Sequence, residues 1–219
     1  MSFIDDFSKM TWIYFLSKKS KEFEKFLEFK DLVENQIDRK IKVLRIDNRG
    51  ELCGKKFDQF CKHHGIARQN TTPYTPQHNG FVERMNKTLI EKARSMLSDA
   101  GLSHDYWAEV VNTTCYVVNR SSTSTLVDKT PYEAWDCKSP SLAHLRVFGC
   151  DAFVHIPKER RQKLDSKSNK CIFFGYKDGV KGYKLWNPTN RIAVYNGDMI
   201  FREVGSTSKT KEVKRVKEP

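Results

Sequence analysis

Thr72-Pro-Tyr-Thr-Pro-Gln-His-Asn-Gly-Phe-Val-Glu83 is the stretch from which the rest of this 219-residue chain can be interpreted. Two prolines, Pro73 and Pro76, disfavour a helix because proline lacks a backbone N–H and biases the preceding residue toward extended backbone. Asn79 can then cap a helix that runs from Phe81 to about Leu97. The stretch therefore predicts a stiff loop that leads directly into a helix.

Apolar residues recur at helical spacing through this predicted helix and form its buried stripe, namely Val82, Leu89, Ala93, Met96 and Leu97. Glu83 lies on a neighbouring flank in the first turn, and Lys87 follows one turn later. A first-turn carboxylate is favoured by the helix dipole, so helix stability alone can explain Glu83. The alternative is a functional carboxylate at the rim of the loop.

The upstream sequence favours the functional interpretation. Ile41–Ile46 reads as a buried strand, and Asp47 follows it directly. An Asp at the carboxyl end of a strand, followed by a turn, is where an α/β sheet presents ligands for a metal or a phosphate. Between Asp47 and Glu83 lie 35 residues, but this spacing alone proves little because 27 of the 219 residues are acidic.

The first 120 residues alternate between strand and helix patterns, which predicts a mixed sheet with helices on its faces. Its first helix is expected to bury Phe23, Phe26, Leu27, Val33 and Ile37. In chain order, the predicted elements are strands at 2–7 and 11–16, a helix capped by Ser20, the strand 41–46, a helix at 55–64, a strand at 66–70, the Glu83 helix, and a helix opened by Gly101 and Ser103.

The pattern changes after residue 120. Thr130 and Pro131 predict the start of a short helix within an otherwise polar linker. Short apolar runs separated by turn residues then predict a small β-barrel, with strands at 147–148, 152–155, 171–175, 184–186 and 192–195. We expect a core at 1–120, a linker with a short helix at 121–144, the barrel at 145–204, and a disordered basic tail at 205–219.

Three motifs resemble the integrase catalytic core of copia-type retrotransposon polyproteins, which belongs to the retroviral integrase superfamily. They are Phe3-Ile-Asp-Asp-Phe-Ser8, Arg45-Ile-Asp-Asn-Arg-Gly-Glu51 and Pro73–Lys87. A later match, from Leu145–Cys150 through Gly175 to Phe201–Glu203, resembles the Src-homology-type barrel that follows the core in these polyproteins. The resemblance implies an α/β core with an RNase H-like mixed sheet and flanking helices, followed by a small all-β barrel.

In that family, three carboxylates bind two Mg²⁺ (or Mn²⁺) ions and support phosphodiester strand transfer during DNA integration. The resemblance implies that Asp47 is the second carboxylate and Glu83 the third. It further implies DNA contacts for Tyr74, Gln77 and Lys87, with element ends and target DNA as partners and a homo-oligomer as the assembly. Hard oxygen ligands of this kind suit Mg²⁺.

Two departures from the family pattern bear on catalysis. In the family, the first catalytic Asp lies on a strand that precedes the first motif, so we expect this chain to lack that strand and to be truncated at its N-terminus. Asp5 and Asp6 belong to the second strand and are not expected to replace it. Arg49 stands where the family usually has Gly and places a cation beside Asp47. We therefore expect impaired catalysis and a marginally stable core.

Composition agrees with a nucleic-acid partner. The formal net charge of +12 arises from 39 basic and 27 acidic residues and suits a polyanion. The sequence has no run of 18 apolar residues and no signal-peptide pattern, which argues against a membrane or secreted protein and for the nucleus or cytoplasm. Two alternatives to an integrase remain: a non-enzymatic nucleic-acid-binding remnant, and a protein-interaction module built on the barrel.

The six cysteines are scattered, and none forms a Cys-x-x-Cys pair, so the sequence gives little support for a zinc site. Cys61 lies close to His63 and His64. On the helical interpretation of this segment, Cys61 and His64 share the inner face with Phe57 and Phe60, so core packing is favoured over metal binding.

Overall fold

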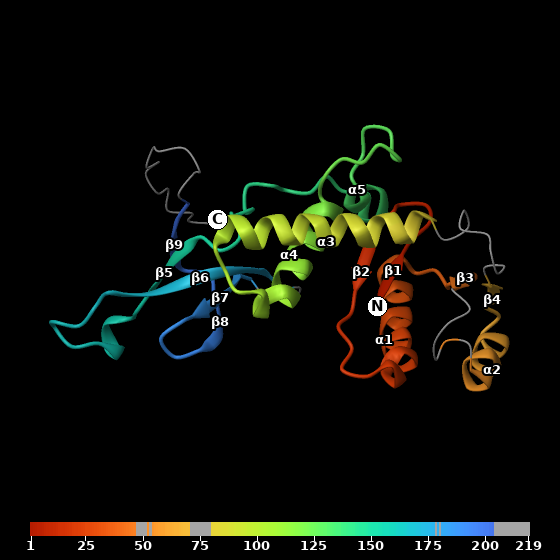
Figure 1. Ribbon diagram of the computed structural model, residues 1–219, viewed down its shortest axis with the longest axis horizontal. Helices are drawn as coiled ribbons and strands as arrows, with labels where there is room; N and C mark the ends of the chain where they lie inside the picture. The colour runs from red at the N-terminus through yellow and green to blue at the C-terminus, as the bar shows by residue number, and fades with distance from the viewer. Residues whose placement is uncertain (47–51, 53, 71–79, 178, 180, 204–219) are drawn as a thin grey trace. The chain divides into compact units, whose positions relative to one another are not determined.

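The computed structural model describes residues 1–46, 52, 54–70, 80–177, 179 and 181–203. The chain forms two compact units (Figure 1). Unit 1 comprises Met1–Ile4 and Trp12–Lys87, and unit 2 comprises Asp5–Thr11 and the described part of Thr88–Pro219.

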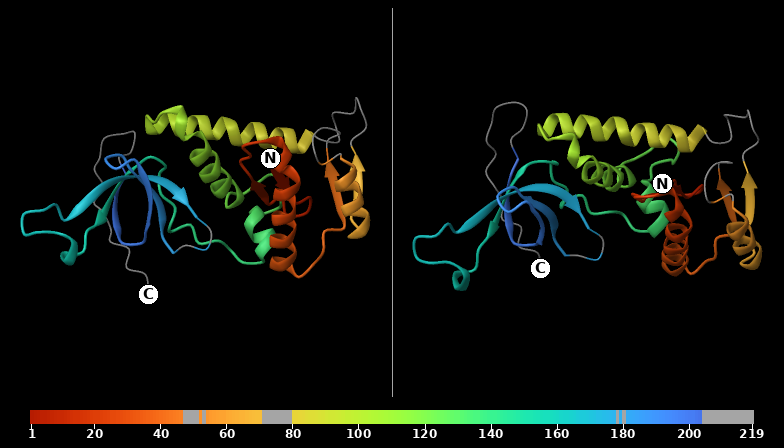
Figure 2. Two further views of the ribbon diagram at one scale, coloured as in Figure 1. Left: turned by 90° about the horizontal axis from the view of Figure 1, so that it is seen from below. Right: turned by 60° about the horizontal axis from the view of Figure 1, so that its bottom comes forward.

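Unit 1 is a mixed α/β arrangement. Its described elements are β1 (Ser2–Ile4), β2 (Thr11–Ile13), the 3-10 turn η1 (Lys19–Lys21), α1 (Glu22–Ile37), β3 (Val43–Ile46), α2 (Lys55–His63), β4 (Ala67–Asn70) and the first two turns of α3 (Gly80–Ala100). The strands form two separate two-stranded sheets, β1–β2 and the parallel pair β3–β4. Figure 2 shows β3 and β4 side by side, with α2 next to them.

Two details of the strands differ from expectation. The predicted strands 2–7 and 11–16 are each three residues long in the structure. The strand ending at Ile46 is not buried throughout, since Val43 is 50% exposed whereas Ile46 is 8% exposed. Only one neighbouring strand pairs with β3 within the described residues, so most of its side chains remain accessible to solvent.

Aromatic side chains from α1, α2 and β1 form the core of unit 1. Phe26 is fully buried, and its ring centroid lies 6.0 Å from that of Phe3 and 5.1 Å from that of Phe57. Phe3 also stacks on Phe29 with centroids 4.1 Å apart. These contacts join one strand and two helices that are distant in sequence.

The prediction for α1 was correct in extent and partly wrong in detail. Ser20 does not cap it, because a 3-10 turn precedes the helix and no side chain caps the first turn. Phe29 is buried, although it was not in the expected set, and Ile37 is 36% exposed. The buried positions Phe26, Phe29 and Val33 lie in the middle of the helix.

Unit 2 combines helices with an antiparallel sheet. Its described elements are the rest of α3, η4 (His104–Tyr106), α4 (Trp107–Asn119), α5 (Pro131–Asp136), β5 (Asp151–His155), η5 (Lys158–Arg160), β6 (Ser168–Tyr176), β7 (Tyr183–Asn187), β8 (Ile192–Asn196) and β9 (Met199–Arg202). The five strands follow the order β8-β7-β6-β5-β9. The predicted strands 152–155, 171–175, 184–186 and 192–195 are confirmed.

The predicted strand at 147–148 is wrong. Cys150 N donates to Val147 O at 3.2 Å and closes a turn there. Gly149 has φ +80°, and a Cβ added to it would lie 2.4 Å from the Cβ of Ala100. Close approach to the end of α3 therefore requires this turn. The strand β9, which closes the other side of β5, was not among the predicted strands.

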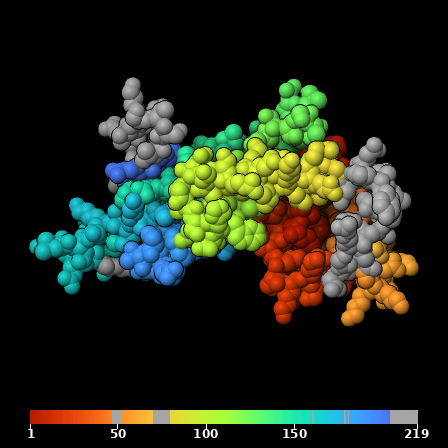
Figure 3. All heavy atoms as spheres, in the orientation of Figure 1, coloured from red at the N-terminus to blue at the C-terminus, as the bar shows by residue number. Residues whose placement is uncertain are grey.

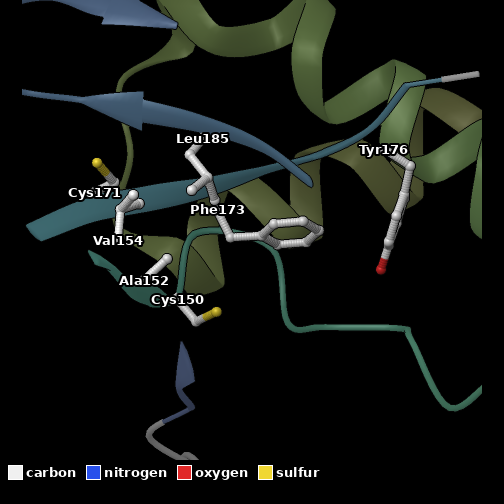
Figure 4. Packing of buried hydrophobic residues seen from close by; sticks show 7 residues of the cluster. All are labelled: Cys150, Ala152, Val154, Cys171, Phe173, Tyr176 and Leu185. Atoms are coloured by element: carbon white, nitrogen blue, oxygen red, sulfur yellow. The ribbon is translucent and has the colours of Figure 1, made fainter. Parts of the chain in front are cut away.

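One face of the five-stranded sheet carries an apolar core, made of Cys150, Ala152, Val154, Cys171, Phe173, Tyr176 and Leu185 (Figure 4). Burial raises the pKa of the Cys150 thiol and of the Tyr176 hydroxyl, each to about 12. Both groups are therefore uncharged at neutral pH and act as packing residues. The Tyr176 hydroxyl accepts a hydrogen bond from Arg146 N at 2.9 Å.

The helix α4 packs directly on this sheet within unit 2. Thr113 Oγ1 donates to Phe174 O at 2.9 Å, and Tyr116 stacks on Tyr176 with ring centroids 4.2 Å apart. A register shift between Phe173 and Gly175 interrupts the β6–β7 ladder. Because successive side chains of a strand point to opposite faces, Phe173 faces the apolar core while Phe174 packs against Tyr106 of η4.

The short helix α5 confirms the prediction for Thr130. Glu133 N donates to Thr130 Oγ1 at 3.1 Å, and Thr130 N donates to Glu133 Oε2 at 2.8 Å. This reciprocal pair is a capping box, and Pro131 occupies the first turn as expected. The hydrogen bond from the Thr130 backbone holds the pKa of Glu133 below its ordinary value.

Asn119 is a buried residue of unit 2 that forms hydrogen bonds with its side chain, and its replacement should lower the stability of the unit. Its Oδ1 accepts from Thr11 N at 3.0 Å, and its Nδ2 donates to Thr11 O at 2.8 Å. We expect Asn119→Leu to lower the free energy of unfolding by about 3 kcal/mol, because Thr11 N loses its hydrogen-bond acceptor and Thr11 O keeps only the weaker hydrogen bond from Cys115 Sγ at 3.3 Å. Urea unfolding measures this loss. The control Asn112→Leu, at an exposed position of the same helix, should change stability little; equal losses would contradict the prediction.

Candidate active site

The parallel strands of unit 1 end at a common edge. β3 and β4 pair in register from Val43↔Ala67 to Ile46↔Asn70. Because the strands are parallel, their carboxyl ends meet at the same edge of the sheet. Asp47 is the next residue after β3, and the chain resumes as α3 at Gly80. This is the edge at which open α/β sheets bind ligands.

Asp47, Tyr74 and Gln77 themselves lie outside the described residues, as does the expected cap Asn79. Their roles therefore remain predictions. The structure describes the elements on either side of them, which are the parallel pair β3–β4 and the helix α3.

The predicted helix with Glu83 in its first turn is confirmed. α3 runs from Gly80 to Ala100, slightly longer than expected, and buries Leu89, Ala93 and Leu97. Glu83 is exposed in the first turn, where the helix dipole favours a negative charge. Lys87 is exposed one turn later on the same side. A carboxylate and a cation therefore lie next to each other at the N-terminal end of this helix.

Two neighbours of Glu83 were not anticipated from the sequence. Ser2 Oγ donates to Asn86 Oδ1 at 3.0 Å, which ties β1 to the start of α3 within unit 1. The side chain of Arg84 folds back over Gly80, since its Nη1 lies 3.0 Å from where a Cβ on that glycine would be. Neither role has a sequence signal, because polar residues on an exposed helix face look alike without their partners.

The carboxylates of Asp5 and Asp6 stabilise the turn after β1. Asp5 Oδ2 accepts hydrogen bonds from Ser8 N and Ser8 Oγ, both at 2.7 Å. Asp6 pairs with Lys9 at 3.0 Å and has a side chain that is 85% exposed. These contacts give both residues a structural role in that turn, whereas the sequence placed them on the strand, which ends at Ile4.

Cys61 is a core residue, as predicted. It is 1% exposed, and burial raises the pKa of its thiol. His63 and His64 are both exposed, so the expectation that His64 lies on the inner face was wrong. His64 instead stacks on Phe60 with ring centroids 3.9 Å apart. Within the described part of the chain, no group of three or more His, Cys, Asp or Glu side chains is arranged to hold a metal ion.

Comparison with known protein families gives a match at each end of the chain. Residues 1–76 match the integrase core domain family, and residues 150–215 match the retroviral polymerase SH3-like domain family. The retrovirus-related Pol polyprotein from transposon TNT 1-94 of Nicotiana tabacum is 48% identical over 203 residues, or 93% of this chain. The chain is a homologue of retrotransposon Pol polyproteins, with an integrase core domain and a retroviral polymerase SH3-like domain.

Other relatives agree with this homology. The retrovirus-related Pol polyprotein from transposon RE1 of Arabidopsis thaliana is 35% identical over 174 residues, or 80% of this chain. The chain spans 15% of the TNT 1-94 polyprotein and 12% of the RE1 polyprotein. It therefore corresponds to a small part of these much longer relatives.

The fold is also similar to that of a solved integrase. A chain in the intasome of simian T-cell lymphotropic virus, in complex with the PP2A regulatory subunit B56 gamma, is 18% identical with a TM-score of 0.50. That match covers 99% of this chain and 71% of the viral chain. The expected RNase H-like α/β class and the small β domain are thus confirmed. No described helix is both long and apolar enough to cross a lipid bilayer.

Proposed function

We propose that this chain forms part of a retrotransposon integrase that joins element DNA to target DNA by phosphodiester strand transfer. In this proposal, Asp47 and Glu83 hold divalent metal, and Tyr74, Gln77 and Lys87 contact the DNA. The main structural support for this proposal is the position of Glu83. It lies in the first turn of α3, in the same unit as the parallel strand that leads into Asp47. The similarity to integrases is the reason to interpret these two carboxylates as metal ligands.

The donor set fits Mg²⁺ or Mn²⁺. Both residues supply carboxylate oxygens, which are the hard ligands that Mg²⁺ prefers. When bound, such ions would activate an attacking hydroxyl and stabilise the leaving oxygen of a phosphodiester. Glu83 contributes its ligand from the N-terminal turn of a helix, where the helix dipole favours a negative charge. Lys87, one turn further, would hold a DNA phosphate beside the ions.

Metal binding is a direct test of the role proposed for Glu83. We expect Glu83→Gln to weaken Mn²⁺ binding at least about tenfold, because even outer-shell partners of metal ligands commonly contribute that much. Titration calorimetry, or relaxation enhancement of water by Mn²⁺, measures the affinity. The matched control is Glu91→Gln, two turns later on the same helix. Equal affinities for the two variants would refute the assignment of Glu83.

DNA is the partner in this proposal, and the net charge of +12 supports it. Integration joins two element ends to one target, so we propose that the active assembly contains several copies of the chain. We place this activity in the nucleus, where target DNA is found.

A second candidate, non-enzymatic nucleic-acid binding, is favoured by the same excess of basic residues. It differs from the first in its dependence on metal. Binding that falls steeply with salt but is unchanged by Glu83→Gln and by removal of divalent ions would favour this candidate. Affinity for element-end DNA that rises with Mg²⁺ in the parent chain, but not in the Glu83→Gln variant, would favour the integrase.

A further inference from the structure

The β5–β6 hairpin of unit 2 ends in a basic segment that has no part in the proposed strand transfer. This segment, residues 156–167, is called the basic hairpin tip. Figures 1 and 3 show it extending beyond the strands β7, β8 and β9. Its charged residues are five basic and two acidic, namely Lys158, Arg160, Arg161, Lys163 and Lys167 against Glu159 and Asp165.

Hydrogen bonds hold the tip in a defined turn. Ile156 N donates to Lys167 O at 3.0 Å, which continues the β5–β6 ladder into the tip. Asp165 N donates to Gln162 O at 3.2 Å, and Gln162 N donates to Asp165 Oδ2 at 2.7 Å. This reciprocal pair closes a four-residue turn, and the remaining two residues of that turn occupy its centre.

Lys163 and Leu164 are these two central residues. The Leu164 side chain is 100% exposed, the highest exposure among the large apolar residues that the structure describes. A leucine at the centre of a hydrogen-bonded turn can contact a partner without rearrangement of the backbone. Single exposed leucines are common on protein surfaces, so exposure alone assigns no role.

The charges around Leu164 indicate the kind of partner. Lys158, Lys163 and Lys167 are exposed, and none of them forms an ion pair with another described residue. The Asp165 carboxylate is already hydrogen-bonded to the turn backbone. A local excess of positive charge favours a polyanion, and DNA phosphates are the partner with matching charge.

We propose that the basic hairpin tip binds duplex DNA in the minor groove, where Leu164 enters between two base steps and bends the helix. A minor groove about 6 Å wide admits the Leu164 side chain at the end of the turn, and the tip lysines can then reach the phosphates on either side. Proteins that bend DNA from the minor groove use apolar wedges in this way. The inference rests on DNA as the partner in the proposed function, and it adds a bending activity to the SH3-like domain.

The first experiment tests the binding of phosphates by the tip lysines, in the full 219-residue chain with a 30-base-pair duplex. The variant Lys158→Ala/Lys163→Ala/Lys167→Ala should lower the slope of log affinity against log salt by about 0.9 for each phosphate that the chain no longer neutralises. The control is Lys18→Ala/Lys40→Ala/Lys138→Ala, which makes the same charge change at exposed positions elsewhere. A slope that falls equally in both triple variants, or in neither, would overturn the inference.

The second experiment tests the wedge. Resonance energy transfer between dyes at the two duplex ends should show a bend on the order of 20–90° with the parent chain. Leu164→Ala should remove most of that bend while the salt slope stays unchanged. The control Val127→Ala alters another residue that is 87% exposed, in the loop after α4, and should leave the bend intact.

The outcomes distinguish the wedge from the integrase function. A parent chain that binds no duplex DNA would refute both. Binding that depends on Lys87, with a bend unaffected by Leu164→Ala, would refute the wedge and leave the proposed function standing. Loss of the bend in Leu164→Ala, but not in Val127→Ala, would support the wedge, and it would agree with DNA as the partner in the proposed function.

Discussion

Gly175→Ala is expected to lower the free energy of unfolding of unit 2 by about 3 kcal/mol or more. Gly175 has φ +131°, a conformation that side-chain-bearing residues rarely adopt, and its added Cβ would lie 2.2 Å from Thr113 Oγ1. Thr113 cannot move away easily, because it is 2% exposed and its hydroxyl donates to Phe174 O. The substitution should therefore separate α4 from the sheet. Urea unfolding gives the size of the loss.

Two further variants test this explanation. Gly101→Ala also introduces a side chain at positive φ, +61°, but nothing lies within 4 Å of its Cβ, so its cost should be limited to about 1–2 kcal/mol of backbone strain. Adding Thr113→Ala to Gly175→Ala should restore part of the stability, because it removes the clashing hydroxyl. If the changes in the free energy of unfolding from Gly175→Ala and Thr113→Ala simply add in the double variant, the contact with Thr113 is not the cause of the destabilisation by Gly175→Ala.

Phe26→Ala should destabilise unit 1 by about 3–5 kcal/mol, a large share of the roughly 5–15 kcal/mol that stabilises a typical domain. Phe26 is fully buried, and its ring contacts Phe3 of β1 and Phe57 of α2. Its removal leaves a cavity where three elements meet. Hydrogen exchange followed by mass spectrometry should show faster exchange in α1, α2 and β1.

Leu32→Ala, at a position of α1 that is 43% exposed, serves as the control for Phe26→Ala and should change stability by less than about 1 kcal/mol. The strands β5 to β9 should exchange at the same rate in both variants, because they belong to unit 2. Faster exchange in those strands with Phe26→Ala would show that the two units do not unfold separately.

Local patterns in the sequence were sufficient for several elements. The Glu83 helix could be predicted because its apolar residues repeat at 3.6-residue spacing, and the cap of α5 because Thr130 and Glu133 satisfy each other within four residues. Both patterns are local and need no knowledge of neighbouring elements. Four strands of the small β domain were also predicted, since turn residues separate their apolar runs.

Errors arose where a distant neighbour decides the conformation. The segment at 147–148 has strand-forming residues, yet Gly149 must turn there because Ala100 lies against it. The strand 41–46 has the composition of a buried strand, but burial depends on how many strands and helices cover it, and Val43 is half exposed. Helical spacing predicts His64 on the inner face, whereas α2 ends at His63 and His64 is its C-cap, so the helical spacing no longer applies there.

The sequence by itself determined the family, the identities of Asp47 and Glu83 as candidate carboxylates, and the helix that carries Glu83, because these depend on residue type and short-range order. Only the tertiary structure showed that α4 packs on the SH3-like sheet through Thr113 and Gly175, that Asn86 bonds to Ser2, and that Leu164 stands exposed in a hydrogen-bonded turn. Such features depend on contacts between residues far apart in the chain, or on the absence of a covering neighbour, and neither leaves a pattern in the local sequence.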